Sequence, residues 1–308
     1  MNEIIIGDCR DTMRGLIDKG VKVQMCVTSP PYFGLRDYGM DGQMGSEETV
    51  GDFVAGMVEV FGLVWDMLED DGTLWLNLGD SYYNYRPGKG QRQGKQSIAG
   101  QKFSEVENCP KRGNKLEGLK EKDLIGIPWR VAFALQADGW YLRQDIIWSK
   151  PNPMPESVKD RCTKSHEYIF LLTKNPHYYY DNEAIKEQAS PDSAVRDRDS
   201  TKMNNTPGRT RMAGLSVNDY EQKNKRSVWT VTTKPYKGAH FATYPKELIE
   251  PCILSGSRVG DIVFDPFVGS GTTAQVAQSL GRRYLGCELN PEYKPLFDNR
   301  TSQPSLGF

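Results

Sequence analysis

The sequence predicts an α/β fold, and three observations lead to that prediction. Short apolar runs rich in Val, Ile and Leu recur between longer stretches that carry apolar residues at helical spacing. A Gly-x-Gly loop stands between one such run and a helical stretch, as in nucleotide-binding βαβ units. A second run ends in a polar corner that contains two prolines. Polar residues that follow parallel strands meet at one edge of a sheet, so both features are candidates for a binding site.

The apolar runs predict seven strands joined by several helices. We expect the strands at 3–6, 21–27, 73–78, 141–148, 167–173, 261–264 and 283–287. Apolar residues at helical spacing predict helices over 50–68, 124–138, 244–254 and 274–280. The last three of these elements in chain order form a βαβ unit, because strand 261–264, helix 274–280 and strand 283–287 follow one another directly.

Two polar and basic stretches interrupt this pattern. Residues 81–122 hold ten Lys and Arg against four Asp and Glu, and residues 183–237 hold eleven against seven. The first stretch has few apolar residues and is predicted to be a mobile basic insertion. The second has some apolar residues, so it is either a small subdomain or a loop that orders on binding. Residues 1–182, which include the first stretch, and residues 238–308 lie on either side of the second stretch.

Composition restricts the class of protein. Six scattered cysteines without a C-x-x-C pair predict neither a zinc site nor a disulfide framework, and three histidines show no metal-ligand spacing. We therefore expect no metal and a reducing, cytoplasmic setting. No stretch approaches the roughly 18 apolar residues of a membrane-spanning helix. The net charge of −1 does not show whether the protein binds nucleic acid, because local basic patches matter more for such binding than the net charge.

The polar corner is Thr28-Ser29-Pro30-Pro31-Tyr32. Its two prolines prevent both a continued strand and an immediate helix. Ser29, the Pro30 carbonyl and the Tyr32 ring are therefore expected to project from the carboxyl end of strand 21–27. Alone, such a corner is a turn that closes a strand. A second motif later in the chain makes it a candidate site.

That second motif is the loop Asp265-Pro266-Phe267-Val268-Gly269-Ser270-Gly271-Thr272-Thr273. It fits a dinucleotide fingerprint, and Glu288 follows at the end of the next strand, where an acidic residue binds ribose hydroxyls. A nicotinamide-dependent dehydrogenase is one interpretation. Asp265, however, would face a pyrophosphate at close range, which is unfavourable for two like charges. A cofactor with a cationic head and no phosphates, S-adenosylmethionine, suits this loop better.

Together, the two motifs resemble the DNA amino-methyltransferases of the β arrangement, in which the corner comes early and the cofactor loop late. The resemblance extends to Gly7-Asp8-Cys9, 75–80, 148–151, 166–168 and 245–254. It implies a Rossmann-like, seven-stranded, mostly parallel methyltransferase sheet, permuted in sequence and carrying polar insertions. Residues 1–182 would be the catalytic half, 183–237 a target-recognition insertion, and 238–308 the cofactor-binding half of the same domain.

The resemblance also implies an activity: transfer of a methyl group from S-adenosylmethionine to an exocyclic amino group of a base flipped out of double-stranded DNA. Ser29 and the Pro30 carbonyl would accept hydrogen bonds from the amine, and Tyr32 would stack on the base. The implied catalytic residues are Ser29, Pro30, Pro31 and Tyr32.

The implied cofactor site has three acidic residues with separate roles. Asp265 would hold the methionine ammonium or adjacent groups, Glu288 the ribose, and Asp8 the adenine amine. The full set of implied cofactor-binding residues is Asp8, Cys9, Thr28, Asp265, Pro266, Phe267, Gly269, Ser270, Gly271, Thr272, Thr273, Glu288 and Asn290.

The sequence leaves the target base open. Ser29 resembles the cytosine-N4 pattern, but Ser-type corners also occur in adenine-N6 enzymes, so cytosine is preferred only slightly. A catalytically inactive DNA-binding homologue, a nicotinamide-dependent dehydrogenase and an RNA substrate also stay open. Cys252 follows Pro251 inside an apolar helical pattern and is interpreted as a core residue rather than a nucleophile. A prokaryotic or phage context is expected, with either a partner restriction nuclease or none, and with a homodimer as one assembly.

Overall fold

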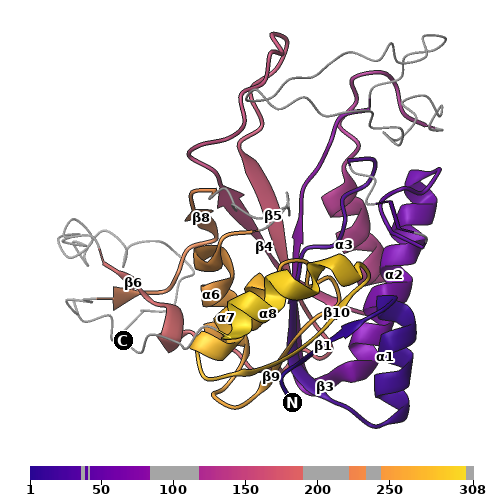
Figure 1. Cartoon of the computed structure of the whole chain (residues 1–308). Helices are drawn as coiled ribbons and strands as arrows, with labels where there is room; N and C mark the ends of the chain where they lie inside the picture. The colour runs from indigo at the N-terminus through magenta and orange to yellow at the C-terminus, as the bar shows by residue number, and fades with distance from the viewer. Residues whose placement is uncertain (36–38, 41, 84–117, 190–221, 234–243, 303–308) are drawn as a thin grey trace, which may run out of the picture.

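A single eight-stranded sheet forms the centre of the protein in the computed structural model (Figure 1), which describes residues 1–35, 39–40, 42–83, 118–189, 222–233 and 244–302. The strand order is β1-β10-β9-β2-β3-β5-β4-β8. β5 is antiparallel to its neighbours β3 and β4, and every other neighbouring pair is parallel. The strands are β1 (Glu3–Ile6), β2 (Val23–Thr28), β3 (Leu68–Leu78), β4 (Tyr141–Ser149), β5 (His166–Thr173), β8 (Val228–Thr230), β9 (Ile262–Asp265) and β10 (Arg283–Glu288).

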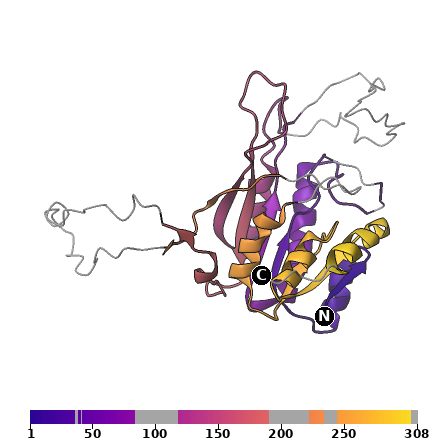
Figure 2. The ribbon, with the colours of Figure 1, turned by 60° about the vertical axis from the view of Figure 1, so that its left-hand side comes forward.

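All seven predicted strands are present, and the mostly parallel α/β sheet is confirmed. The eighth strand, β8, comes from the polar stretch 183–237 and pairs with β4 at the sheet edge. The same stretch contains a 3₁₀ turn (Glu183–Ile185) and a small ribbon of β6 (Glu187–Gln188) and β7 (Gln222–Lys223), which stands apart from the main sheet (Figure 2). Residues 190–221 and 234–237 of that predicted insertion, and 84–117 of the predicted basic insertion, lie outside the described residues.

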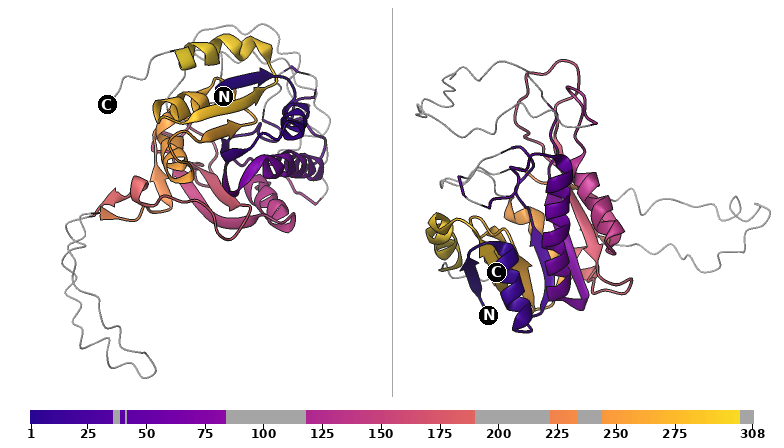
Figure 3. Two further views of the ribbon diagram at one scale, coloured as in Figure 1. Left: turned by 90° about the horizontal axis from the view of Figure 1, so that it is seen from below. Right: turned by 90° about the vertical axis from the view of Figure 1, so that its right-hand side faces the viewer.

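Helices cover both faces of the sheet (Figure 3). One face carries α1 (Cys9–Asp18), α2 (Val50–Met67) and α3 (Ile127–Ala137), and the other carries α6 (Lys246–Gly256) and α7 (Thr272–Ser279). A short turn (Pro291–Tyr293) leads into α8 (Lys294–Ser302), which packs on α7. In the described part of the chain, none of the helices has the length and apolarity needed to cross a membrane.

Helix α1 was not predicted from the sequence. Four of its ten residues are charged, and its buried side chains are those of Cys9, Met13 and Leu16. Its start is set by Asp8, whose side chain accepts a hydrogen bond from the backbone N–H of Arg10 at 2.8 Å. An aspartate at this position satisfies one of the unpaired N–H groups of a first helical turn.

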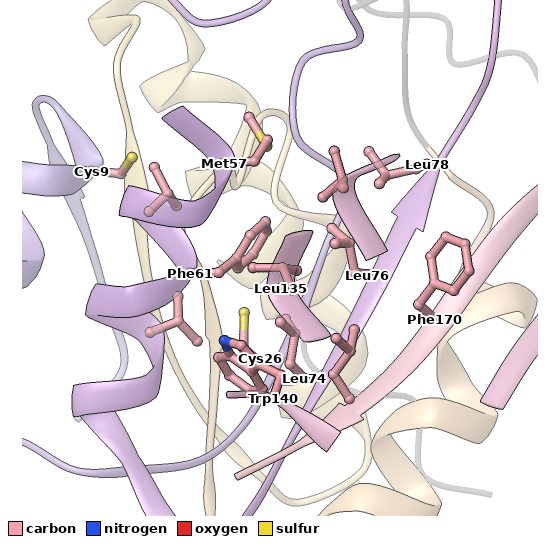
Figure 4. Close-up of a cluster of buried hydrophobic side chains, with 14 of the residues drawn as sticks. Cys9, Cys26, Met57, Phe61, Leu74, Leu76, Leu78, Leu135, Trp140 and Phe170 are labelled. Carbon is pink, nitrogen blue, oxygen red and sulfur yellow. The ribbon is translucent and has the colours of Figure 1, made fainter. Parts of the chain in front are cut away.

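Alternating residues of the central strands build two separate cores. On β2, Met25 and Val27 pack toward α6 and α7, whereas Cys26 packs toward α2. The same alternation places Trp75 of β3 on the α6 side and Leu74 on the α2 side. Figure 4 shows part of the core on the α2 side, in which α2 side chains meet those of β2 and β3. β2 is buried along its whole length, and four of its six residues are apolar, as expected for a strand that is covered on both faces.

The polar residues that follow the strands gather at one edge of the sheet. β1, β2, β3, β9 and β10 are parallel, so their carboxyl ends share that edge, and antiparallel β5 brings its first residues there. The neighbours β2 and β9 lead into helices on opposite faces, α2 and α7. The crevice between two such strands is where open α/β sheets bind ligands.

Candidate active site

A cavity of about 740 Å³ opens at this edge of the sheet, within the usual size range of ligand pockets. It brings the early corner and the late glycine loop together, although they are far apart in the sequence. The predicted site residues that line it are Asp8, Cys9, Ser29, Pro30, Pro31, Tyr32, Pro266, Phe267, Gly269, Ser270, Thr272, Glu288 and Asn290. Four predicted site residues do not line it: Thr28, Asp265, Gly271 and Thr273.

The corner directly follows β2 and presents Ser29 and the Tyr32 ring to the cavity. The Ser29 hydroxyl lies 3.4 Å from the Tyr32 hydroxyl, which donates a 2.8 Å hydrogen bond to Glu167. One side of the Tyr32 ring lies against Gly79, where a Cβ would come within 2.5 Å of Tyr32 Cε2. Glycine at position 79 therefore makes room for the ring.

The glycine loop connects β9 to α7 and forms the opposite wall. Gly269 adopts φ 54°, a conformation that favours glycine, and its N–H donates a 2.8 Å hydrogen bond to Glu288. The Asn290 N–H donates to the other oxygen of Glu288, also at 2.8 Å. Burial raises the pKa of this carboxyl, while the two backbone N–H groups oppose that rise. Glu288 is thus held rigidly, with lone pairs left for hydroxyl groups of a ligand.

Asp8 lies on the third side of the cavity, at the start of α1. Its carboxylate accepts two hydrogen bonds from the Arg10 guanidinium, which holds its pKa below the usual range. The carboxylate is therefore ionised and fixed at neutral pH. Cys9, beside it, is 8% exposed, and burial raises the pKa of its thiol to about 12. Cys9 can contact a ligand by packing but not as a thiolate.

Asp265 lies beneath the cavity rather than in its wall, which differs from the direct ligand contact expected from the sequence. Its carboxylate accepts hydrogen bonds from the Thr28 hydroxyl at 2.6 Å, the Thr273 hydroxyl at 2.5 Å and the Phe267 N–H at 2.9 Å. The Tyr244 hydroxyl donates to it at 3.2 Å. The side chain is 2% exposed, and burial raises the pKa of this carboxyl, while its hydrogen bonds oppose that rise. Asp265 joins the strand before the corner to the helix after the glycine loop.

Gly271 also has a packing role that the sequence did not reveal. Its φ of 85° favours glycine, and a Cβ there would lie 2.5 Å from the Cβ of Phe297 in α8. The close approach of α8 therefore requires glycine at this position. The neighbouring Thr272 hydroxyl accepts a hydrogen bond from Arg300 of the same helix.

The buried cysteines that the structure describes offer no activated nucleophile. Cys252 is 0% exposed inside α6, and burial raises the pKa of its thiol above the usual range, as it does for Cys26 and Cys287. The interpretation of Cys252 as a core residue is confirmed. Among the residues with a described position, no group of three His, Cys, Asp or Glu side chains could hold a metal ion.

Four further residues of the cavity wall had no assigned role from the sequence: Asn77, Lys150, Glu167 and Tyr244. Lys150 follows β4 and Glu167 lies on β5, so their ion pair joins two neighbouring strands. Both residues lie in segments that carry the family resemblance, 148–151 and 166–168. That resemblance was the one feature of the sequence that pointed to them. The contact of Glu167 with Tyr32 depends on tertiary structure.

The donor set of the cavity fits S-adenosylmethionine. The Ser270 hydroxyl is buried in the cavity wall and has no hydrogen-bond partner within the described part of the chain, so it can bind a polar ligand group. Glu288 offers acceptors to ribose hydroxyls, Asp8 offers an acceptor to an amine, and Phe267 offers an apolar surface. The carboxyl groups of Asp8 and Glu288 in this part of the cavity suit a cationic ligand without phosphates.

Comparison with known proteins identifies the family. Residues 23–299 match the model of the DNA methylase family (N6_N4_Mtase). The Type II methyltransferase M.SmaI of Serratia marcescens is 48% identical over 298 residues, which cover 97% of this chain and 90% of that protein. The Type II methyltransferase M.Cfr9I of Citrobacter freundii is 48% identical over 294 residues, covering 96% and 85%.

Two solved structures share the fold. The cytosine-N4-specific PvuII DNA methyltransferase aligns with a TM-score of 0.62 and 17% identity, covering 100% of this chain and 89% of that one. TTHA0409 of Thermus thermophilus, a putative DNA modification methylase solved with S-adenosylmethionine, aligns with a TM-score of 0.60 and 21% identity, covering 100% and 96%. The dehydrogenase interpretation is thereby set aside, and the chain belongs to the DNA methylase family, the amino-methyltransferases of the N6 and N4 class.

Proposed function

We propose that this protein methylates the N4 amino group of a cytosine in a specific sequence of double-stranded DNA, with S-adenosylmethionine as the methyl donor. The observation that carries the proposal is the cavity that the corner and the glycine loop share. A donor and an acceptor must meet in one enclosed space for a direct transfer, and positioning of this kind supplies much of the rate enhancement.

The cofactor would occupy the wall formed by Asp8, Phe267, Ser270 and Glu288, and it supplies an electrophilic methyl group on a cationic sulfur. Glu288 would accept from the ribose hydroxyls, and the Ser270 hydroxyl would bind a polar end of the molecule. Asp265 supports this wall from below through Phe267 and Thr273. In this proposal Asp265 acts on the cofactor indirectly, through the shape of the loop.

The corner would hold the acceptor base. An exocyclic amine is a weak nucleophile because its lone pair is delocalised into the ring. The Ser29 hydroxyl and the Pro30 carbonyl can accept hydrogen bonds from its two N–H groups and so favour a pyramidal nitrogen with an available lone pair. The amine is buried in a duplex, so the base must leave the helix, and Tyr32 would stack on the flipped base.

Adenine N6 is the second candidate, because the corner could serve either ring. The serine at position 29 favours cytosine by resemblance, and the cytosine-N4-specific PvuII enzyme shares the fold. One experiment separates the two: long-read sequencing of DNA from a host that expresses the protein, which reports the modified base and its sequence motif together. N4-methylcytosine at one motif is expected. N6-methyladenine at one motif would refute the choice of cytosine.

The alternative that this protein binds DNA without methylating it is tested by measuring the transfer of a labelled methyl group to duplex DNA. DNA binding without incorporation would refute the enzymatic proposal, and incorporation into single-stranded RNA alone would refute the DNA substrate. By analogy with the Type II names of its relatives, we further propose a bacterial or phage setting with a restriction nuclease of the same specificity. A homodimer is tested by light scattering of the purified protein.

A further inference from the structure

A compact polar cluster in the cavity wall joins the corner to residues outside both motifs. Tyr32 belongs to the corner, Asn77, Lys150 and Glu167 form the rest of the cluster, and all four residues line the cavity. The Tyr32 hydroxyl donates to Glu167 Oε2 at 2.8 Å and lies 3.4 Å from Asn77 Oδ1. The Asn77 side-chain amide is itself oriented by the Tyr168 carbonyl at 3.0 Å. The cluster therefore ties a residue of the corner to β3 and β5.

Lys150 sets the orientation of the Glu167 carboxylate. Its ammonium pairs with Glu167 Oε1 and lies 4.1 Å from the centre of the Trp148 ring. The side chains of Lys150 and Glu167 are only 17% and 15% exposed. A mostly buried ion pair of this kind keeps a fixed geometry, because leaving either charge alone would be costly. The second carboxylate oxygen is left to receive the Tyr32 hydroxyl.

The Tyr32 ring is thus held at two points. Gly79 supports one side of the ring, where a Cβ would approach Cε2 to 2.5 Å, and Glu167 holds the hydroxyl at the far end. Two contacts of this kind prevent the ring from swinging about its side-chain torsions. Tyr32 is part of the cavity lining, so the ring keeps a surface toward the space in which a base would lie.

We propose that Glu167, oriented by Lys150, is a positioning residue that fixes the Tyr32 ring for stacking on the flipped base. The inference rests on the proposed function, in which Tyr32 receives the base. Glu167 acts through Tyr32 rather than on the cofactor, so its removal slows methyl transfer and leaves cofactor binding intact.

The first test is a double-mutant cycle of Glu167→Gln and Tyr32→Phe, measured as the single-turnover rate on duplex DNA. Glu167→Gln is expected to lower the rate about ten-fold in the wild-type background, because the charge-assisted hydrogen bond to Tyr32 becomes a weaker, neutral one. In the Tyr32→Phe background it should change the rate less than about two-fold, because the hydroxyl it serves is gone. Calorimetry should show unchanged affinity for S-adenosylmethionine. Independent, multiplying effects or weakened cofactor binding would overturn the proposal.

The second test does not require methyl transfer. The protein is labelled with 3-fluorotyrosine, and the Tyr32 signal in the ¹⁹F NMR spectrum is assigned by its loss in Tyr32→Phe. Glu167→Gln should displace that signal. The matched control is Asp71→Asn, since Asp71 pairs with Arg258 at 3.2 Å near the start of β3, away from the cavity.

The two tests separate the two claims. A wild-type protein that transfers no methyl group refutes the proposed function, while the NMR measurement still decides whether Glu167 holds Tyr32. An unmoved Tyr32 signal in Glu167→Gln, or an equal displacement in Asp71→Asn, refutes the positioning role whatever the activity.

Discussion

Gly79→Ala should impair catalysis by displacing the Tyr32 ring without changing any group that contacts the base or the cofactor directly. The added Cβ would lie 2.5 Å from Cε2, 3.1 Å from Cδ2 and 3.2 Å from Cζ of Tyr32. Carbon atoms pack best at about 3.5–4.0 Å, so the ring must retreat by about 1 Å. Gly79 is not among the glycines with positive φ, so alanine adds no backbone strain there.

The displacement of the Tyr32 ring determines how large a loss of rate is expected. A misplacement of about 1 Å in a reaction site lowers the rate about 100-fold. Tyr32 cannot relieve the contact by a free rotation, because Glu167 holds its hydroxyl at 2.8 Å. We expect a loss of about 100-fold in the single-turnover rate of methyl transfer to duplex DNA, with the affinity for S-adenosylmethionine changed less than about two-fold.

Gly62→Ala is the matched control, because a Cβ at Gly62 in α2 meets no atom within 4 Å. That variant should keep full activity and gain about 1 kcal/mol in the free energy of unfolding, as for glycine replaced in a helix. The double variant Gly79→Ala, Tyr32→Ala should lose no more of the single-turnover rate than Tyr32→Ala alone. A Gly79→Ala enzyme with the wild-type rate, or with an added loss in the Tyr32→Ala background, would refute the reasoning.

Three further predictions concern the rest of the site. Asp265→Ala should lower the free energy of unfolding by about 3 kcal/mol in urea denaturation, because the buried Thr28 hydroxyl and the Phe267 N–H lose their acceptor and Thr273 keeps only the Tyr244 hydroxyl as a partner. Weakened cofactor binding at unchanged stability would instead support direct contact. Burial raises the pKa of Glu288 above its ordinary 4.5. The affinity for S-adenosylmethionine should therefore fall as the pH is lowered through that raised pKa. Calorimetry on Glu288→Gln should show binding that is weaker and does not depend on pH. The same shift makes the unliganded protein lose stability as the pH rises through the raised pKa, because the buried carboxyl group prefers to be protonated. If both the stability of the unliganded protein and its affinity for S-adenosylmethionine fell at low pH, this account would be contradicted. Ser29→Ala should slow methyl transfer at least about ten-fold in single-turnover assays without changing the affinity for the cofactor, because a hydrogen bond made in the transition state is lost. An equal loss of cofactor affinity would contradict the placement of Ser29 beside the acceptor base.

Much of the fold followed from local patterns. The apolar runs located all seven predicted strands, because strands that are covered on both faces are rich in apolar residues, as β2 is. Helix α1 was missed although Cys9, Met13 and Leu16 recur at helical spacing, because the helix is short and polar overall. β8 was missed because three residues in a polar stretch carry no periodic signal. The parts of the predicted insertions outside the described residues stay predictions.

The sequence alone was enough to place the corner after one strand and the glycine loop after another, and to indicate a cationic nucleoside cofactor. These features depend on neighbours in the chain: prolines that end a strand, and glycines that turn into a helix. The family resemblance depended on the same short segments.

Tertiary structure was needed wherever a role depends on a partner far along the chain. Thr28 and Asp265 are 237 residues apart, and Tyr32 and Glu167 are 135 residues apart, yet each pair shares a hydrogen bond. The first pair shows that Asp265, predicted as a cofactor-binding residue, also links β2 to β9. The second turns an unassigned glutamate into the support of Tyr32. Hydrogen bonds depend on distances of about 3 Å in space, and no local pattern in the chain encodes such distances.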